Sequence, residues 1–410
     1  MSRPKFIISA LGCKVSQYDA AVLKRLLLEK GLEFSNKNPD LVIINTCSVT
    51  KNAISKDKQV IKKFKELFPA AKLVVMGCWP QTNDNLAKEV PDILFWGVGE
   101  INALAEKIAA FFPDLEKVTN FEAGLLVSSD KSRYFLKVGD GCNQFCSYCL
   151  IPYARGPITS RPLSELVLEV SAAVEAGYGE IVLSGIHLGR YGQDLKNGES
   201  LISLLQALIA IPKLGRLRLS SIEVNEVSDE LINLMLSNDK ICQHLHISLQ
   251  SGCDKILKLM KRPYDTAYFE ERLSKLRLAM PNIAISTDII VGFPGETAQD
   301  FVDTCRFAES MAFSKIHVFS FSAHEKTAAY QLPDRVPGDK IKQRSKILRD
   351  ISSELENNYE TETLRKLQGK KIKVIIEHIR GGNVKGKTEF YFDIPILVSG
   401  KVGTLVEVEL

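Results

Sequence analysis

The first 113 residues alternate between short apolar runs rich in β-branched residues and longer stretches with apolar residues at helical spacing. The runs that predict strands cover 5–10, 40–45, 72–77 and 92–97. The patterns that predict helices cover 19–31, 50–68 and 101–112. Strands that alternate with helices form a parallel sheet covered by helices, so we expect an α/β domain over 1–113. A polar stretch at 113–130 predicts a linker.

Longer strand–helix units continue over a second predicted domain, 128–357. Its expected strands cover 134–139, 180–185, 216–221, 244–249, 284–292 and 315–321. Six units fall short of the eight of a closed barrel, so they predict an open or partial (β/α)6 barrel. A polar helix is expected over 339–366. From 367 to 410, glycine turns separate strand-like runs, which predicts a small all-β barrel as a third domain.

Composition narrows the class of protein. The 410 residues are 45% hydrophobic and 25% charged, which is typical of a globular protein with two or three domains. The net charge of +4 does not indicate a nucleic-acid binder. The sequence contains neither a signal-peptide pattern nor an apolar run long enough to cross a membrane. Nine cysteines, an odd number, argue against a paired disulfide set, so we expect a cytoplasmic protein with metal or redox chemistry.

The strongest local signal is a group of three cysteines directly after the first expected strand of the second domain. Cys142, Cys146 and Cys149 are separated by three and then two residues. Thiolates this close can hold one metal centre, and three ligands leave one position of a tetrahedral zinc or cubane iron–sulfur site open. An open position suits catalysis. The alternative is a structural zinc site that takes a fourth ligand from elsewhere.

A second group of cysteines is spread over the first domain. Cys13, Cys47 and Cys78 each follow one of its expected strands. The carboxyl ends of parallel strands meet at one edge of a sheet, so we expect these thiols to converge and to leave one ligand position open. The alternative is three buried structural thiols. The remaining cysteines show no such placement, and we expect buried thiols that are not ligands at Cys242, Cys253 and Cys305.

The CxxxCxxC spacing, with the aromatic Tyr148 before its last cysteine, resembles the signature of the radical S-adenosylmethionine (SAM) enzymes. The resemblance implies that Cys142, Cys146 and Cys149 hold a [4Fe–4S] cluster, that SAM chelates its open iron, and that Tyr148 lies near the adenine. It also implies reductive cleavage of SAM to a 5′-deoxyadenosyl radical. The electron would come from an external donor such as a flavodoxin or ferredoxin.

Both cysteine groups, followed by a small β domain, resemble the methylthiotransferases over almost the whole chain. In that family the first three cysteines hold an auxiliary [4Fe–4S] cluster, which implies this role for Cys13, Cys47 and Cys78, and a terminal TRAM domain binds RNA. The branch that modifies N6-threonylcarbamoyladenosine (t6A) in tRNA is most similar. The segments that carry this similarity are LGCKVSQYDA (11–20), NTCSVT (45–50), YCLIPYARGPITSRP (148–162), SGIHLGRYGQDL (184–195), HLHISLQSG (244–252) and DIIVGFPGET (288–297).

This branch implies methylthiolation of C2 of t6A at position 37, in the anticodon stem–loop of tRNA. One SAM would donate a methyl group to a sulfur on the auxiliary cluster, and a second would yield the radical that removes hydrogen from adenine C2. The C–H bond has no acidic proton for a general base to remove. The sequence does not indicate the sulfur donor. The alternatives are the same chemistry on isopentenyladenosine in tRNA or on a ribosomal-protein aspartate, and a zinc-containing RNA-binding protein.

The resemblance also assigns residues to the SAM pocket. We expect the turn with Ser184, Gly185 and His187 to approach the methionine end of SAM, and Gly292 to pass near the adenine. Arg155 is expected to pair with a carboxylate or to position the substrate. The polar residues expected at strand ends, where they would bind the ribose or amino group of SAM, are Glu223, Gln250, Ser251 and Asp288. Taken alone, such residues are more typical of caps, so the assignment depends on their shared position at the barrel mouth.

The chain departs from the family pattern in places. The family has asparagine at the position of Ser16 and proline at that of Val224. The segment 322–327 lacks the arginine and glycine of the family, and 386–391 also diverges, so no residue role is carried over there. Six lysines within 51–66, and others at the start of the third domain, suit phosphate contacts, but a lysine-rich helix is more typical of a solvated face. RNA binding is therefore expected from the resemblance.

Overall fold

The chain forms two compact units in the computed structural model. The structure describes residues 3–83, 85–86, 90, 92–113, 115, 132–381, 383–398 and 400–410. The first unit comprises 1–130, 140–143 and 149–157, and the second comprises 131–139, 144–148 and 158–410. The expected linker, 113–130, lies almost entirely outside the described residues. The third expected domain, 367–410, falls in the second unit together with the barrel strands.

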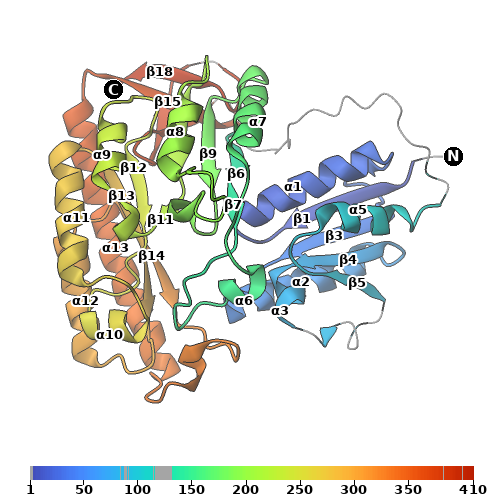
Figure 1. Cartoon of the computed structure of the whole chain (residues 1–410), viewed down its shortest axis with the longest axis horizontal. Coiled ribbons are helices and arrows are strands. Elements are labelled where there is room, and N and C mark those ends of the chain that lie inside the picture. The colour runs from blue at the N-terminus through green and yellow to red at the C-terminus, as the bar shows by residue number, and fades with distance from the viewer. Residues whose placement is uncertain are drawn as a thin grey trace. The chain divides into compact units, whose positions relative to one another are not determined.

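A five-stranded parallel sheet in the order β2-β1-β3-β4-β5 forms the centre of the first unit (Figure 1). Its strands are β1 (Lys5–Ala10), β2 (Glu33–Phe34), β3 (Leu41–Thr46), β4 (Lys72–Gly77) and β5 (Ile93–Trp96). Its helices are α1 (Lys14–Glu29), α2 (Lys51–Leu67), α3 (Cys78–Thr82) and α5 (Ile101–Ala109). The α/β prediction is confirmed. The sequence pattern did not predict β2 and α3, because elements this short show no hydrophobic period.

Both faces of this sheet are buried, which explains why β3 is apolar along most of its length. Ile43 belongs to a core that α1 and α5 complete on one face, whereas Val42 and Ile44 belong to a core that includes residues of α2. Helix α2 begins where it does because the Thr50 hydroxyl accepts a hydrogen bond from the backbone N–H of Ala53. The two cores hold the carboxyl ends of the strands in a fixed row.

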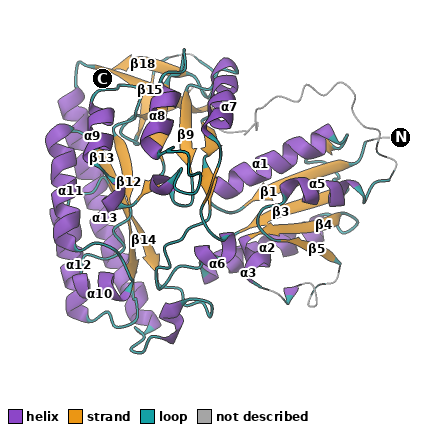
Figure 2. Ribbon diagram, in the orientation of Figure 1, coloured by secondary structure: helices purple, strands orange, loops and turns teal. Residues whose placement is uncertain are grey.

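The second unit contains the six expected parallel strands (Figure 2). They are β6 (Tyr134–Lys137), β9 (Glu180–Ser184), β10 (Arg216–Leu219), β12 (His244–Ile247), β13 (Ala284–Val291) and β14 (Lys315–Ser320). One sheet has the order β10-β9-β6 and another β11-β12-β13-β14, in which β11 is Ser221–Ile222. A parallel bridge between Leu217 and Ile241 connects the two sheets. The expected six-stranded α/β architecture is thereby confirmed.

Helices and short strands connect these elements. The longer helices are α7 (Leu163–Glu175), α8 (Leu201–Ile209), α9 (Asp229–Leu236), α10 (Asp254–Leu259), α11 (Thr266–Ala279), α12 (Ala298–Ser310) and α13 (Gly338–Leu367). The short elements are β7 (Gly139–Asp140), α6 (Ile151–Arg155) and β8 (Thr159–Ser160). Side chains that accept hydrogen bonds from the first turn of their helices fix the starts of α9, α11 and α12, namely Ser228, Asp265 and Thr297. Within the described parts of the chain, no helix is long and apolar enough to cross a membrane.

The C-terminal residues form an antiparallel sheet in the order β17-β16-β15-β18. Its strands are β15 (Lys371–Arg380), β16 (Asn383–Thr388), β17 (Asp393–Ile396) and β18 (Leu405–Glu409). The all-β character expected for this region is confirmed. Strand β16 stops at Thr388, because Tyr391 has a positive φ of 71° and the N–H of Thr388 closes a turn onto the carbonyl of Phe392 at 3.0 Å.

A buried ionic cluster joins this sheet to the barrel strands. Glu180, which is fully buried on β9, accepts hydrogen bonds from Arg216 at 2.6 Å and Arg218 at 2.8 Å, and Arg133 lies 3.6 Å away. Arg216 also donates to the carbonyls of Lys373 and Lys387 in the C-terminal sheet, at 2.8 Å each. We call Glu180 and these three arginines the Glu180 cluster. It fixes the C-terminal sheet to the amino ends of β9 and β10.

Candidate active site

The first cysteine group lies at the carboxyl ends of three neighbouring strands. Cys47 follows β3, Cys78 begins α3 directly after β4, and Cys13 is the N-cap of α1, which follows β1. Cys13 is exposed, Cys47 is half-buried and Cys78 is buried. The pKa of the Cys47 thiol is raised to about 11, mainly by burial and in smaller part by charge on Cys78 and Cys13. Cys47 is thus close enough to Cys78 and Cys13 for their charges to affect it.

Arg155 on α6 lies beside this group, within the first unit. Its guanidinium donates to both carboxylate oxygens of Asp140, at 2.8 and 3.0 Å, and lies 3.5 Å from Asp19 on α1. Burial raises the pKa of the Cys78 thiol, and the charge of Arg155 and a hydrogen bond from it oppose that rise. The expectation that Arg155 pairs with a carboxylate agrees with these contacts. Through them, the cation connects α6 to α1 and to the thiol that begins α3.

A carboxylate that the sequence pattern did not predict lies at the strand ends beside Cys47. Asp57 on α2 is 1% exposed and accepts a hydrogen bond from the backbone N–H of Cys47 at 3.0 Å. Burial raises the pKa of Asp57 to about 6. A signal was present, because Asp57 is the one acidic residue within the lysine-rich stretch 51–65. An acidic residue inside a basic amphipathic pattern indicates a local partner, which here is the backbone of a cysteine.

Replacing Arg155 with methionine is expected to destabilise the first unit by about 3 kcal/mol, because it leaves the carboxylates of Asp140 and Asp19 without their buried cation. Urea denaturation of iron-free protein followed by tryptophan fluorescence reports on this unit, since both tryptophans of the chain lie in it, at 79 and 96. Arg25→Met is the matched control, because its partly exposed pair with Glu29 is worth below about 1 kcal/mol. Equal shifts for both variants would contradict the prediction.

The second cysteine group lies on the irregular segment 141–150, between β7 and α6. Cys142 and Cys149 belong to the first unit and Cys146 to the second. The backbone N–H of Cys142 donates to the carbonyl of Gly156 at 3.0 Å. Gly141 has a φ of +71°, and a side chain there would collide with the carbonyl of Pro157. The segment therefore needs glycine directly before its first cysteine.

All nine cysteines lie in the described part of the chain, and no disulfide joins any of them there. The three predicted non-ligands differ in burial. Cys242 is buried, whereas Cys253 caps α10 and donates to Asp300 at 3.4 Å, and Cys305 on α12 is half-buried. The expected burial is therefore correct for Cys242 and wrong for the other two, because both lie at or on helices with a solvated side.

Most residues assigned to the SAM pocket lie at or shortly after the carboxyl ends of barrel strands, whereas Asp288 lies within β13, three residues before its end, so the expected strand-end position is wrong for Asp288. Ser184 is the last residue of β9, and His187 Nε2 lies 2.6 Å from Oε1 of Glu226. Glu226 also accepts from the backbone N–H of Glu223, so it holds His187 and the turn after β11 together. Glu226 was missed by sequence analysis. Glu226 is difficult to predict from the sequence, because one acidic residue in a short turn is usually exposed.

The remaining pocket residues differ in their surroundings. Asp288 on β13 lies 3.0 Å from Nε2 of His246 on β12, another residue missed from sequence. Gln250 has a positive φ of 72° and forms a bridge with Ile289. Ser251 accepts from the backbone N–H of Cys253, which is a cap-like contact. Gly292 has a φ of +76°, donates to the Glu296 carboxylate, and faces Ile341 where a side chain would otherwise lie.

The described residues contain no three His, Cys, Asp or Glu side chains grouped to hold a single metal ion. The donor chemistry nevertheless fits iron–sulfur clusters, because thiolates are their usual ligands. In such a cluster each thiolate binds a different iron atom, so the ligands lie farther apart than around a single metal ion. Each set supplies three thiols, one short of the four iron corners of a cubane cluster. The donor type and the placement of both sets are therefore compatible with iron–sulfur clusters.

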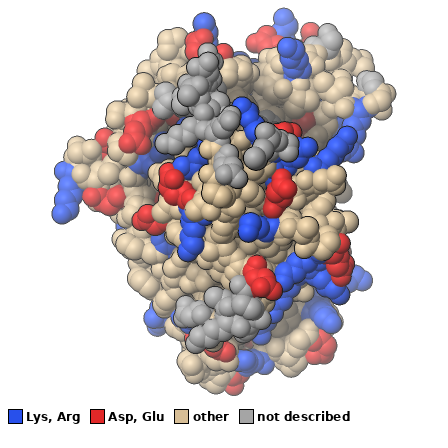
Figure 3. Space-filling view, turned by 90° about the vertical axis from the view of Figure 1, so that its right-hand side faces the viewer, with Lys and Arg blue, Asp and Glu red and all other residues tan. Residues whose placement is uncertain are grey.

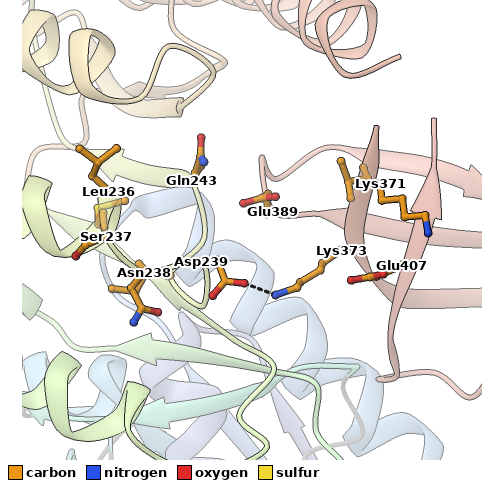
Figure 4. Close-up of a pocket in the computed structure, with 12 residues that line it drawn as sticks. Leu236, Ser237, Asn238, Asp239, Gln243, Lys371, Lys373, Glu389 and Glu407 are labelled. Carbon is orange, nitrogen blue, oxygen red and sulfur yellow. Dashed lines mark hydrogen bonds and ion pairs between the residues drawn. The ribbon is translucent and has the colours of Figure 1, made fainter. Parts of the chain in front are cut away.

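A polar cleft of about 480 Å³ opens between the segment after α9 and the C-terminal sheet (Figure 4). Lys373 on β15 extends across it to Asp239, with 2.7 Å between the charged atoms. Lys371, Glu389 and Glu407 also line the cleft. No cysteine is among its lining residues. The cleft thus differs in chemistry from the strand-end sites, and one of the lysines considered for phosphate contact already has a carboxylate partner.

The fold and the cysteine-bearing segment define a radical SAM enzyme. The model of the Radical SAM superfamily matches residues 136–308, and the model of the Uncharacterized protein family UPF0004 matches residues 5–97. The solved structure of the radical SAM methyltransferase TsrM from Kitasatospora setae is similar in fold, with a TM-score of 0.56 and 17% identity. That similarity covers 78% of this chain and 75% of TsrM.

Relatives over nearly the full length identify the family. The chain is 35% identical to the threonylcarbamoyladenosine tRNA methylthiotransferase MtaB of Chlamydia pneumoniae, covering 99% of this chain and 95% of that protein. It is 31% identical to the tRNA-2-methylthio-N(6)-dimethylallyladenosine synthase of Desulfitobacterium hafniense, covering 99% and 94%. The chain therefore belongs to the radical SAM methylthiotransferase family, whose members use SAM and two [4Fe–4S] clusters.

Proposed function

We propose that this protein methylthiolates C2 of t6A at position 37 of tRNA and so produces 2-methylthio-t6A. The observation that carries the proposal is the presence of two cysteine triads, one on the strand ends of the first unit and one on the segment before α6. Sulfur transfer to an unactivated carbon needs both a radical source and a sulfur site. The choice of t6A is supported by an MtaB relative that is 35% identical over 99% of this chain, whereas a ribosomal protein uS12 methylthiotransferase RimO reaches the same identity over 86% of it.

The two triads have separate roles in this proposal. Cys142, Cys146 and Cys149 would hold the cluster that binds SAM, and Cys13, Cys47 and Cys78 would hold the auxiliary cluster. When bound, these groups supply the radical chemistry and the sulfur, which no side chain of the protein can provide. The residues of the chain bind and orient these groups. Tyr148 would lie beside the adenine, and Ser184, Gly185 and His187 would lie at the methionine end of SAM. The residues around the ribose, the amino group and the base would be Glu223, Gln250, Ser251, Asp288 and Gly292.

Three partners follow from this chemistry. The substrate is tRNA, bound by its anticodon stem–loop. A one-electron donor of the flavodoxin or ferredoxin type would reduce the SAM-binding cluster, and a sulfur donor would replenish the auxiliary cluster. A cytoplasmic location suits a tRNA substrate. Charge alone does not identify the RNA surface, since Figure 3 shows basic and acidic side chains interspersed over the face in view.

Mass spectrometry of tRNA nucleosides from a strain lacking the gene tests the substrate. We expect 2-methylthio-t6A to disappear, t6A to accumulate in its place, and the methylthio derivative of isopentenyladenosine to remain unchanged. Re-expression of the natural chain is expected to restore the product, and the Cys146→Ala variant is the inactive control. Loss of the isopentenyladenosine product instead would transfer the activity to that substrate. Unchanged nucleosides would direct the search to a protein aspartate.

A further inference from the structure

Arg262 lies against the radical-SAM cysteine segment, although it is more than a hundred residues away in the chain. It follows α10, its side chain is 2% exposed, and its Nη1 atom donates to Sγ of Cys146 at 3.2 Å. The same atom lies 3.4 Å from the hydroxyl of Tyr148. Both contacts are internal to the second unit. A buried cation therefore touches a proposed cluster ligand and the aromatic residue assigned to the adenine.

Hydrogen bonds to the backbone around Arg262 fix its position. The N–H of Ser147 donates to the carbonyl of Met260 at 3.0 Å, and the Ser147 hydroxyl donates to the carbonyl of Leu259 at 2.7 Å. These bonds attach the cysteine segment to the end of α10. Lys261 then has a positive φ of 58°, and the N–H of Arg262 returns to the carbonyl of Leu257. These backbone hydrogen bonds place the side chain of Arg262 beside Cys146.

The other edge of the guanidinium is also engaged. Its Nη2 atom forms an ion pair with Glu223, one of the residues assigned to SAM. Its Nε atom donates to the hydroxyl of Tyr264 at 2.9 Å, and that hydroxyl donates in turn to the carbonyl of Ser248 at 2.5 Å. Since Ser248 directly follows β12, Arg262 is braced against the barrel. All three nitrogens of the guanidinium have a partner, which fixes the orientation of the guanidinium toward the Cys146 sulfur.

We propose that Arg262 is a positioning residue that raises the reduction potential of the SAM-binding cluster through its N–H bond to the Cys146 sulfur. The inference rests on the proposed role of Cys142, Cys146 and Cys149. Reduction adds one electron to the cluster, and an N–H donor with a positive charge stabilises the more negative form. Arg262 also holds Glu223 in place, so the setting of the potential and the orientation of one SAM contact depend on the same side chain.

The test measures the midpoint potential by a redox titration followed by electron paramagnetic resonance. The parent protein carries Cys13→Ala, Cys47→Ala and Cys78→Ala, so one cluster contributes to the signal. In this background, Arg262→Gln is expected to lower the ratio of reduced to oxidised cluster about tenfold at a fixed potential, which equals about 59 mV for one electron. Arg262→Lys retains the charge without the fork, and a smaller shift in the same direction is expected.

Two further variants separate this effect from general damage. Tyr264→Phe removes a brace of Arg262 without touching a cysteine and is expected to shift the potential in the same direction, by less than Arg262→Gln. Arg272→Lys is the matched control, because Arg272 is a buried arginine of the second unit that pairs with Asp229. Its potential is expected to equal that of the parent. If Arg262→Gln fails to load iron, the shifts of Arg262→Lys and Tyr264→Phe decide the question.

The outcomes distinguish this inference from the proposed function. A parent with about four irons and variants with an unchanged midpoint would overturn the role of Arg262 and leave the cluster assignment intact. A parent that binds no iron would refute the cluster assignment itself, and the inference would fail with it. A downward shift of the midpoint potential that is largest for Arg262→Gln, smaller for Arg262→Lys and absent for Arg272→Lys supports a direct effect of Arg262 on the cluster.

Discussion

Replacing Cys146 with alanine is expected to abolish methylthiolation and to reduce the iron bound after reconstitution from about eight to about four atoms per chain. A cubane cluster held by three thiolates does not survive the loss of one, and without it SAM cannot be cleaved to the radical. Iron analysis, the visible absorbance of the clusters and mass spectrometry of the tRNA product measure the three consequences. The same result is expected for Cys142 and Cys149, which belong to the same segment.

The matched control is Cys305→Ala. Cys305 is a half-buried thiol on α12, and its removal is expected to leave about eight irons and full activity. The complementary variant replaces Cys13, Cys47 and Cys78 together, and it is expected to retain SAM cleavage while losing sulfur transfer. An iron content of four or fewer in the natural protein, unchanged in this triple variant, would refute the auxiliary cluster.

Replacing Glu180 with alanine is expected to lower the free energy of unfolding by about 3–5 kcal/mol. The reason is that the carboxylate is fully buried and balances the guanidiniums of Arg133, Arg216 and Arg218, which would remain inside the protein without their counter-charge. Thermal or urea denaturation followed by circular dichroism measures the loss. Hydrogen exchange is expected to place it at β15 and β16, whose carbonyls the arginines bind.

Glu175→Ala is the control for this variant, since the ion pair of Glu175 with Lys213 is exposed and contributes below about 1 kcal/mol. The effect of Glu180 has a defined pH dependence. Burial alone would raise its pKa, but Arg218 and Arg216 outweigh burial and hold the pKa far below the usual value of about 4.3. The stabilisation is therefore complete above that usual value and is lost progressively as the pH falls from it through the lower folded pKa. A difference between natural protein and variant that declines between pH 6 and 8 would contradict this explanation.

Local sequence patterns were sufficient to predict most of the fold. Apart from β2, the strands of the sheet and the six parallel barrel strands were predicted within a few residues, because buried parallel strands are continuous apolar runs. Helix α1 begins at Lys14, five residues before the expected start at 19. Its first turn contains Ser16 and Gln17, which hide the apolar period, and its N-cap is a cysteine whose side chain makes no capping hydrogen bond.

The candidate site was predictable only where its residues carry their own signal. Cysteine spacing and placement after strands indicated six positions, and these signals are local. Arg262 lies 116 residues from Cys146, and Asp288 lies 42 residues from His246, so neither contact leaves a trace in the nearby sequence. An arginine after a helix is by itself typical of a solvated position. The supporting residues of the site therefore became visible only through tertiary contacts.

The Glu180 cluster limits how the C-terminal sheet can be handled or exchanged. Small terminal domains are often treated as appendages that can be removed or grafted between enzymes. Here the carbonyls of Lys373, Lys387 and Thr388 are acceptors for guanidiniums that belong to the barrel strands. A protein cut after α13 would leave those donors facing solvent at an opened barrel base. A replacement domain would preserve the catalytic barrel only if it placed carbonyls at the same positions. Exchange during evolution for a domain without those carbonyls requires matched changes at Arg216 and Arg218.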